Sequence, residues 1–264
     1  MIDIHNHVLI GIDDGPQTEE AAVALLKQAI DNGITDIIAT PHHHSGAFFN
    51  SESKIIEKME ELTKIIEKHQ LDIKVHPGQE IRINGDMVSE LQSGVSLSLN
   101  QSQYVLVEFS FTDVPNYVES LLYDLQMKGY IPVIAHPERC KPIIKNPDRL
   151  YEIVEKGAIA QITASSITGA LGDDLKEVSL KMIENNLAHV ISSDAHSAEI
   201  RPFLLKKAYD VVSEELGENF TEVLQFNADA ILHNKEVRVK PPQKMETQQK
   251  KGKKQKKKKF LGLF

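Results

Sequence analysis

The chain has 264 residues and is 41% hydrophobic, which is enough for one large core or two modest ones. No apolar run approaches the roughly 20 residues of a membrane span, and the start, Met1-Ile2-Asp3-Ile4-His5, has neither the basic nor the apolar region of a secretory signal. We therefore expect a cytoplasmic protein. Its single cysteine, Cys140, excludes an intrachain disulfide and a thiolate zinc site.

The net charge of −8 is divided unevenly along the chain. Residues 241–264 hold nine lysines and one acidic residue, for +8, whereas residues 1–240 hold 21 basic and 37 acidic residues, for −16. An acidic body is unlike a nucleic-acid-binding domain, in which the basic surface belongs to the fold. We therefore expect one domain over residues 1–240, no nucleic-acid binding, and a disordered Lys-rich tail over residues 241–264.

Strand-like and helix-like segments alternate along the expected domain. In chain order, the expected strands are residues 2–5, 36–40, 73–76, 104–107, 131–135, 158–162 and 188–191. The expected helices begin with one capped by Thr18 and ended by Gly33, and continue as residues 51–68, 116–128, 147–156, 175–185 and 201–216. One or two short helices should follow, to about Val237, and residues 89–102 should be a less regular stretch.

Short buried strands that alternate with amphipathic helices predict a parallel sheet. Seven such units in about 240 residues favour a closed α/β barrel over an open doubly wound sheet. No Gly-rich phosphate loop follows the first strand, which argues against the open nucleotide-binding folds. In such barrels the active site lies at the C-terminal ends of the strands.

Imidazole and carboxylate side chains recur just after the expected strands. His5 and His7 are two residues apart, so on a strand their side chains leave the same face. The other residues in this position are His42, Glu80, Glu108, His136, Asp194 and His196. Such ligands without thiolate suit manganese, iron(II) or zinc, and several carboxylates favour a multinuclear site, because one carboxylate can bridge two cations. Arg139 and Arg201 lie close enough in sequence to hold phosphate oxygens there.

Taken in this order, the motifs resemble those of the polymerase-and-histidinol-phosphatase (PHP) family. They are Asp3-x-His5-x-His7, Thr40-Pro41-His42, Gly78-x-Glu80, Ala135-His136-Pro137-Glu138-Arg139 and Ser193-Asp194-Ala195-His196. Within the family, the match over about residues 1–240 is to the bacterial tyrosine-protein phosphatases of capsule and exopolysaccharide operons, the CpsB/YwqE type. The resemblance implies a distorted seven-stranded barrel and a trinuclear centre of Mn²⁺, with Fe²⁺ or Zn²⁺ as alternatives. It also implies metal-dependent hydrolysis of phosphotyrosine on proteins, chiefly on the tyrosine-rich tail of a cognate bacterial tyrosine kinase.

The resemblance assigns roles to individual residues. One cation would be held by His5, His7, Glu80 and Asp194; a second by Glu80 as a bridge, with Glu108 and His136; and a third by Asp14, His42 and His196. Asp14 could instead, or also, act as general acid to the leaving phenolate. Arg139 and Arg201 would bind the phosphate, and a metal-activated hydroxide would attack phosphorus directly.

Three other functions remain open at this point. One is a small-molecule phosphatase, for instance acting on histidinol phosphate. Another is a nuclease-like PHP module serving a polymerase, and the acidic body counts against it. The third is a non-catalytic regulatory partner of a kinase, and the intact ligand set counts against that. His43 and His44 flank a predicted ligand and are either substrate-facing or solvated.

The end of the chain allows two interpretations. A lysine run from Lys250 to Lys259 precedes Phe260-Leu261-Gly262-Leu263-Phe264. Such composition is typical of a solvated tail, but a basic run with an apolar end can also contact anionic lipid or an acidic partner. In the second case, deleting residues 241–264 should abolish sedimentation with liposomes and leave small-substrate turnover intact.

Overall fold

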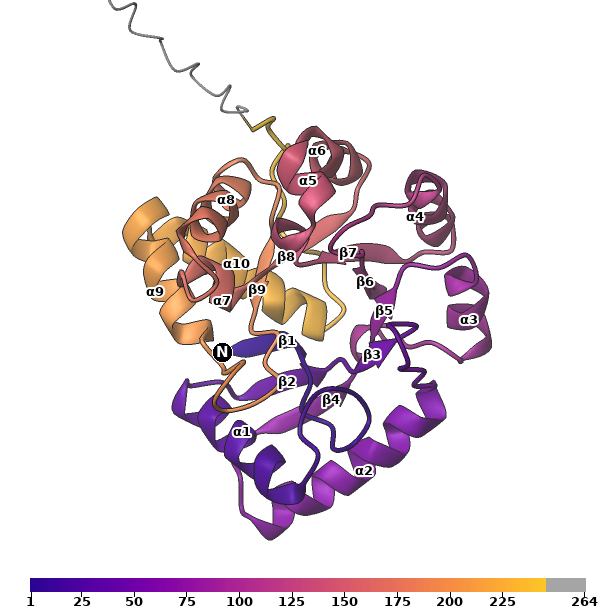
Figure 1. The fold of residues 1–264 in the computed structure, drawn as a ribbon, viewed down its shortest axis with the longest axis vertical. Helices are drawn as coiled ribbons and strands as arrows, with labels where there is room; N and C mark the ends of the chain where they lie inside the picture. Colours follow the sequence, from indigo (N-terminus) through magenta and orange to yellow (C-terminus); the bar gives the residue numbers. More distant parts are fainter. Residues whose placement is uncertain (246–264) are drawn as a thin grey trace, which may run out of the picture.

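The computed structural model describes residues 1–245, and residues 246–264 lie outside that description. In it, parallel strands lie at the centre and helices surround them (Figure 1). One sheet has the order β1 (Ile2–Asn6), β2 (Asp36–Ala39), β4 (Lys74–Pro77). The other has the order β3 (His42–His43), β5 (Glu80–Arg82), β6 (Tyr104–Glu108), β7 (Ile131–Ala135), β8 (Ile159–Thr163), β9 (Val190–Ser192). All pairings between these strands are parallel, so the predicted parallel α/β architecture is confirmed.

Two of the expected strands, residues 36–40 and 73–76, are each followed by a further short strand in the other sheet. Thr40 and Pro41 separate β2 from β3, and Gly78 and Gln79 separate β4 from β5, so both chain segments pass from one sheet to the other. Proline lacks the N–H that a ladder needs, which explains the first break. At the second, a Cβ on Gly78 would lie 2.6 Å from the Ile38 side chain, so only glycine permits this approach. The sequence predicted neither β3 nor β5, because each of these short strands follows a break.

Six outer helices correspond to the six expected ones, and they are α1 (Glu19–Asp31), α2 (Glu52–Lys68), α4 (Val118–Met127), α6 (Asp148–Glu155), α8 (Asp173–Glu184) and α9 (Leu205–Leu216). Two short helices, α5 (Lys141–Lys145) and α7 (Ala164–Ile167), were not predicted. The Thr18 hydroxyl accepts the Ala21 N–H at 3.3 Å, as expected for the cap of α1. The stretch over residues 89–102, expected to be less regular, contains the end of the short helix α3 (Met87–Ser93) and the short helix η1 (Leu99–Gln101), which includes the non-helical Asn100.

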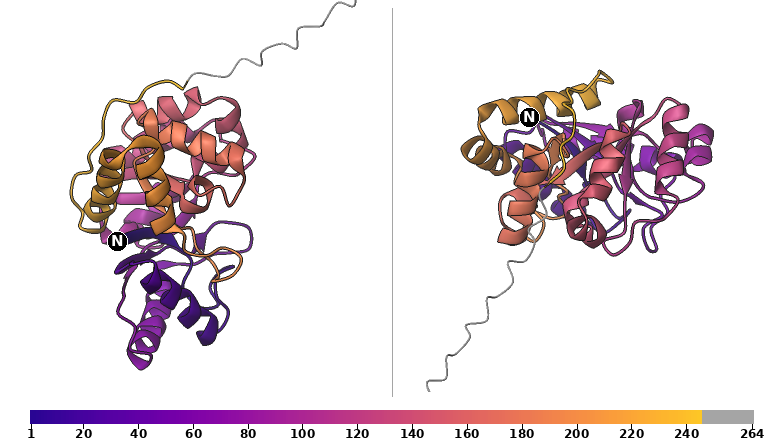
Figure 2. Two further views of the ribbon diagram at one scale, coloured as in Figure 1. Left: turned by 90° about the vertical axis from the view of Figure 1, so that its left-hand side faces the viewer. Right: turned by 90° about the horizontal axis from the view of Figure 1, so that it is seen from above.

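The last helix, α10 (Glu218–Leu232), closes one end of the strands. Its side chains Ala228, Ile231 and Leu232 belong to an inner apolar cluster with Ile4 of β1 and Leu106 of β6. Figure 2 (left) shows α10 at one end of the strands and the loops after β1 and β9 at the other. One helix of 15 residues therefore replaces the one or two short helices expected, because a continuous apolar face is needed to cover this end.

The inner cluster also explains where the polar side chains go. On β6, Tyr104 and Leu106 point into the inner cluster, while Val105 and Val107 face the outer helices. Glu108 is the next residue in the inward series and is buried at the open end of the strands. Alternation along a strand thus delivers this carboxylate to the rim.

Of the predicted Lys-rich tail, only residues 241–245 are described. The Gln243 N–H donates to the Asn185 carbonyl at 2.8 Å, Lys244 pairs with Asp148 at 3.3 Å, and Met245 is buried against the main core. The basic run and the apolar end lie outside the described residues. Within residues 1–245, no helix is long and apolar enough to cross a membrane.

Candidate metal centre

The Glu80 carboxylate lies at the centre of the site. It is fully buried, and its Oε1 lies 3.4 Å from His5 Nε2, while its Oε2 lies 3.5 Å from His7 Nε2. Glu80 Oε2 is also 2.7 Å from His42 Nδ1, and Oε1 is 2.9 Å from His136 Nε2. Burial alone would raise the pKa of Glu80, but His5 and His42 hold it well below its usual value. One carboxylate therefore faces four imidazoles from three separate segments of the chain.

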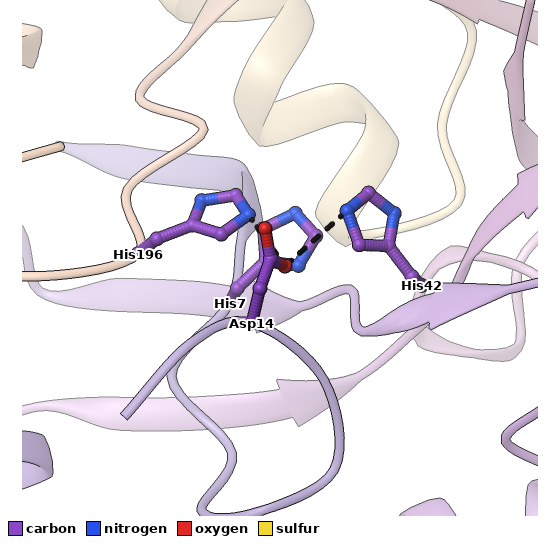
Figure 3. A group of neighbouring side chains, drawn as sticks. All are labelled: His7, Asp14, His42 and His196. Carbon is purple, nitrogen blue, oxygen red and sulfur yellow. Dashed lines mark ion pairs between the residues drawn. The ribbon is translucent and has the colours of Figure 1, made fainter. Parts of the chain in front are cut away.

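A second group lies at the mouth of the site (Figure 3). His7, Asp14, His42 and His196 each offer a ligand atom, and these atoms lie within 4.8 Å of one another. Asp14 Oδ1 is 3.2 Å from His196 Nε2 and 3.5 Å from His42 Nε2. The His7 ring stacks on the His196 ring with centroids 3.7 Å apart.

The remaining predicted ligands complete a row across the rim. Ring centroids are 5.6 Å apart for His136 and His5 and 5.5 Å for His5 and His7, and the stack on His196 continues the row. His42, Glu80 and Glu108 form another group with ligand atoms within 4.8 Å. The site therefore extends from the end of β7 to the loop after β9.

Asp194 joins the histidines to the two arginines. Its Oδ1 lies 3.6 Å from His5 Nε2 and 3.5 Å from His7 Nε2. Its Oδ2 accepts hydrogen bonds from Arg139 Nη1 at 2.5 Å and from Arg201 Nη2 at 2.7 Å. The structure thus brings every predicted site residue to one end of the strands.

Two of these residues have unusual backbone conformations. His136 has φ of +33° and Asp194 has φ of +53°, in the left-handed region that non-glycine residues rarely adopt. The Asp194 N–H donates to the His5 carbonyl at 2.8 Å, which holds this turn against β1. Backbone strain of this kind concentrates at functional sites, where the surroundings impose it.

The hydrogen bonding of buried atoms in the site supports the presence of cations. Among the described residues, His42 Nδ1, Glu80 Oε2, Glu108 Oε2 and His196 Nε2 are buried and make no hydrogen bond of regular geometry, although each lies within 3.2 Å of an oppositely charged group. Burying so many polar atoms in one place without aligned hydrogen bonds is costly. A nitrogen and oxygen donor set without sulfur fits first-row divalent cations, so the residues present fit a metal centre.

In the absence of cations, protons would compete for the same ligand atoms. Burial would lower the pKa of His42, but Glu80 and Glu108 raise it to about 10. His5 behaves in the same way, and Glu80 and Asp194 raise its pKa to about 9. For Asp14, burial opposes ionisation, yet His196 and His42 lower its pKa well below the usual value. An ionised Asp14 suits a metal ligand better than a proton donor.

Residues that hold the ligands were missed in the sequence. Asp13, for which the sequence predicted no role, has its Oδ2 2.7 Å from His7 Nδ1, and the same oxygen accepts the His42 N–H at 3.1 Å. Gln161 Oε1 lies 2.9 Å from His5 Nδ1. Such partners leave Nε2 of each ring for a cation. Asp13 could have been identified in the sequence because it is adjacent to the predicted ligand Asp14. Gln161 could have been identified only from its inward-facing position on a strand.

Arg82 is a third residue of this kind. Its Nε and Nη2 lie 3.0 Å from Glu108 Oε2 and Oε1, respectively, so the guanidinium grips both carboxylate oxygens. Arg82 lies two residues after Glu80 on β5, so both side chains face the same way. The sequence contained this spacing, but β5 itself was not predicted.

A separate group of His43, His44 and Glu90 has ligand atoms within 4.8 Å. His44 Nε2 lies 2.8 Å from Glu90 Oε1, and His43 Nε2 lies 3.4 Å from Oε2. However, His43 Nδ1 accepts the Asn50 N–H at 3.1 Å. A neutral His43 ring therefore carries its proton on Nε2, where it faces the carboxylate. His43 Nε2 makes no hydrogen bond of regular geometry, but it faces Glu90, and His44 Nε2 contacts both Glu90 oxygens, so this group needs no cation to balance the carboxylate.

Comparison with known proteins gives one family. The family model described as "Capsular polysaccharide synthesis, CpsB/CapC" matches residues 1–233. The chain is 44% identical over 243 residues to the tyrosine-protein phosphatase YwqE of Bacillus subtilis, covering 92% of this chain and 96% of the relative. It is 42% identical over 244 residues to the putative tyrosine-protein phosphatase CapC of Staphylococcus aureus, covering 92% and 95%. It is 32% identical over 222 residues to CpsB of Streptococcus pneumoniae, covering 82% and 91%.

Solved structures agree with this result. A match with a TM-score of 0.92 and 44% identity, covering 94% of this chain and 100% of the other, comes from a study of YwqE from Bacillus subtilis and CpsB from Streptococcus pneumoniae, described as "unique metal-dependent tyrosine phosphatases". A histidinol phosphate phosphatase from Lactococcus lactis matches with a TM-score of 0.51 and 16% identity, covering 82% and 93%. The second match shows a shared fold alone.

Proposed function

Because the chain belongs to the CpsB/CapC family of capsular polysaccharide synthesis, we propose that it is a metal-dependent protein-tyrosine phosphatase. The observation that carries the proposal is the cluster around Glu80, with Arg139 and Arg201 joined to it through Asp194. Imidazoles and carboxylates there match a multinuclear cation site, and the two guanidiniums match a phosphate.

We propose the following distribution of ligands. The first cation is held by His5, His7, Glu80 and Asp194; the second by Glu80, Glu108 and His136; and the third by Asp14, His42 and His196. The 2.9 Å separation of His136 Nε2 from Glu80 Oε1 supports the second group, and the Asp14 contacts support the third. The group of His7, Asp14, His42 and His196 shares His7 with the group of His5 and Glu80, and it shares His42 with the group of Glu80 and Glu108. The Glu80 carboxylate is therefore well placed to bridge neighbouring cations.

Bound cations would supply hydroxide from water near neutral pH and would stabilise charge on the phosphoryl group. The residues of the chain would orient the substrate. Arg139 and Arg201 would bind the equatorial phosphate oxygens, and Asp194 would hold both guanidiniums in place. Asp14, being ionised, would act first as a ligand. Manganese is the cation we propose, with iron(II) or zinc as alternatives that the same donors accept.

We further propose where the reaction takes place and on what. The substrates would be tyrosine-phosphorylated proteins, chiefly a cognate bacterial tyrosine kinase, with the cytoplasm as the location. The family's link to capsular polysaccharide synthesis supports this setting. The acidic body gives no support for nucleic-acid binding.

We also propose that the strands form a distorted seven-stranded barrel. If β2 with β3 and β4 with β5 are each counted as one broken strand, the order runs from β1 to β9 without interruption. The first and last strands of this order also meet at their ends. Asn6 of β1 forms a parallel bridge with Ala195, which follows β9, and the His7 N–H donates to the Ala195 carbonyl at 2.8 Å. These contacts support closure beside the metal centre.

One experiment tests the activity and its rivals. Chelator-stripped protein would be reloaded with Mn²⁺, Fe²⁺ or Zn²⁺ and offered a phosphotyrosine peptide, histidinol phosphate and single-stranded DNA. We expect turnover of the peptide only after reloading, and at least a hundredfold loss in Glu80→Gln together with loss of bound metal. Preference for histidinol phosphate or DNA would overturn the substrate, and activity in excess chelator would overturn the mechanism.

A further inference from the structure

Two cavities open on either side of Arg201. The first, of about 560 Å³, lies between the start of α1 and the loop after β9, and its lining includes Asp14, Pro16, Ala21, Ala24, His196 and Arg201. The second, of about 420 Å³, lies between α7 and the same loop, and its lining includes Arg139, Ala170, Leu171, Asp194 and Arg201. Glu199 and Ile200 border both cavities, so this loop forms a ridge between them.

The first cavity combines apolar outer walls with a polar inner end. Ala21 and Ala24 are exposed and lie three residues apart, so their methyl groups share one face of α1. Pro16 adds a ring to this wall, and Ile200 at the border is 86% exposed. At the inner end, Asp14 and His196 belong to the metal centre. A site of this kind suits a ligand with an apolar body and a charged end.

The direction of the reaction favours this cavity for the leaving group. In phosphoryl transfer, the attacking and leaving oxygens lie roughly in line on opposite sides of phosphorus. The second cavity is bordered by both arginines and by Asp194, which already joins them, and these groups suit the equatorial phosphate oxygens. The first cavity contains one arginine, and it also contains the buried imidazole of His196, whose Nε2 faces Asp14 Oδ1 at 3.2 Å. Negative charge on a departing oxygen is best stabilised at that end.

Building on the proposed phosphatase function, we propose that the first cavity, called here the tyrosyl cavity, receives the aromatic ring of the substrate phosphotyrosine. Pro16, Ala21 and Ala24 would contact the ring, while Arg201 holds the phosphate at the inner end. A phosphorylated serine or threonine has no ring to bury there. Burial of the ring in the tyrosyl cavity therefore contributes to selectivity for tyrosine.

The test compares two phosphonates that cannot be hydrolysed. Phenylphosphonate and methylphosphonate share a charged group and differ in the ring, and their dissociation constants for manganese-loaded protein are measured by calorimetry. We expect the wild type to bind phenylphosphonate at least about tenfold more tightly, which corresponds to about 1.4 kcal/mol. Ala24→Phe should fill the tyrosyl cavity and reduce this ratio to about one. Ala21→Phe is a second variant with the same expected effect.

The matched control is Ala170→Phe, which places the same side chain in the second cavity and should retain the wild-type ratio. Unchanged methylphosphonate binding shows that Ala24→Phe and Ala21→Phe are folded and loaded with manganese, whereas for Ala170→Phe the ratio alone is compared. A ratio near one in the wild type would overturn the inference. So would a loss of the ratio in Ala170→Phe but not in Ala24→Phe or Ala21→Phe. If the ratio behaves as expected but no phosphotyrosine peptide is hydrolysed, the proposed function fails and the tyrosyl cavity stands.

Discussion

At the scale of single residues, the site depends on how each ligand is held. Glu80 and the histidines come from several strands and the loops after them. The residue type alone does not determine which of these side chains will be neighbours in the folded protein. Their partners Asp13, Gln161 and Arg82 set the ring orientations and the carboxylate position through hydrogen bonds of 2.7 to 3.0 Å. Partners of this kind tune the affinity for a cation as well as the geometry.

Replacing Arg82 with lysine tests this role. Arg82→Lys keeps the charge but removes the two-point grip on Glu108. We expect the affinity for manganese to fall about tenfold, because Glu108 loses its fixed orientation. Metal content after dialysis against graded chelator measures the change. Arg149→Lys, at an exposed position on α6, is the control. Equal metal retention in the two variants would contradict the positioning role.

His189 provides a prediction about pH that is independent of the metal centre. It lies just before β9, is 5% exposed, and its Nδ1 accepts the Ala160 N–H. Burial lowers its pKa to about 4, from 6.5. The unfolded chain therefore binds this proton first, so the stability contributed by neutral His189 is present above pH 6.5 and is lost as the pH falls toward 4.

The measurement is the free energy of unfolding between pH 7 and pH 4.5, for the wild type and for His189→Asn. The asparagine oxygen can still accept the Ala160 N–H but does not titrate. Below pH 6.5, the wild type should lose about 1.4 kcal/mol more per pH unit than the variant. Parallel curves for the two proteins would contradict the assignment.

At the scale of elements, the two broken strands shape the rim. The breaks at Pro41 and Gly78 let β3 and β5 join the larger sheet, and this change of sheet sets His42 beside Glu80 as register partners. In a continuous strand, side chains would keep alternating between the two faces of the sheet, and either His42 or Glu80 would then point away from the metal centre. The break is therefore part of how the ligands meet.

Gly78→Ala tests the importance of the second break. The added Cβ would meet Ile38 at 2.6 Å, with Leu99 and Thr40 at 3.3 Å, so the strands must separate. We expect a loss of about 1–3 kcal/mol in unfolding free energy, measured with urea, and weaker manganese binding. Gly85→Ala is the control, since no atom lies within 4 Å of its Cβ. Equal stability of the two variants would show that the close approach is dispensable.

At the scale of the whole molecule, the folded domain extends beyond residue 240, because residues 241–245 contact it. Met245 is buried in the main core and Gln243 binds the end of α8. A deletion after residue 240 would therefore remove packing as well as the lysines. Any test of the basic run must leave residues 241–245 in place.

Two truncations separate these effects. The fragment 1–245 should unfold with the same free energy as the full chain, whereas 1–240 should be less stable by about 1–3 kcal/mol, chiefly from Met245. If the basic run contacts anionic lipid, the full chain should sediment with phosphatidylserine liposomes and 1–245 should not, while both hydrolyse a small aryl phosphate equally. Failure of the full chain to sediment would remove the membrane interpretation.

Much of this protein was predictable because its signals are local. Strand and helix periodicity, the Thr18 cap and ligands just after strands can be recognised within a few residues, and they led to the parallel α/β fold and the candidate ligand set. Alternation along β6 was enough to direct Glu108 inward.

What required the folded chain was proximity between distant segments. Gln161 meets His5 across 156 residues, and Arg139 meets Asp194 across 55. Such pairs depend on strand register, on where a strand breaks and on the left-handed backbone of His136 and Asp194. None of these features can be detected from the periodicity of the sequence. Residue type and spacing therefore identify which groups can bind cations, whereas packing decides which groups orient them and where a substrate ring has room.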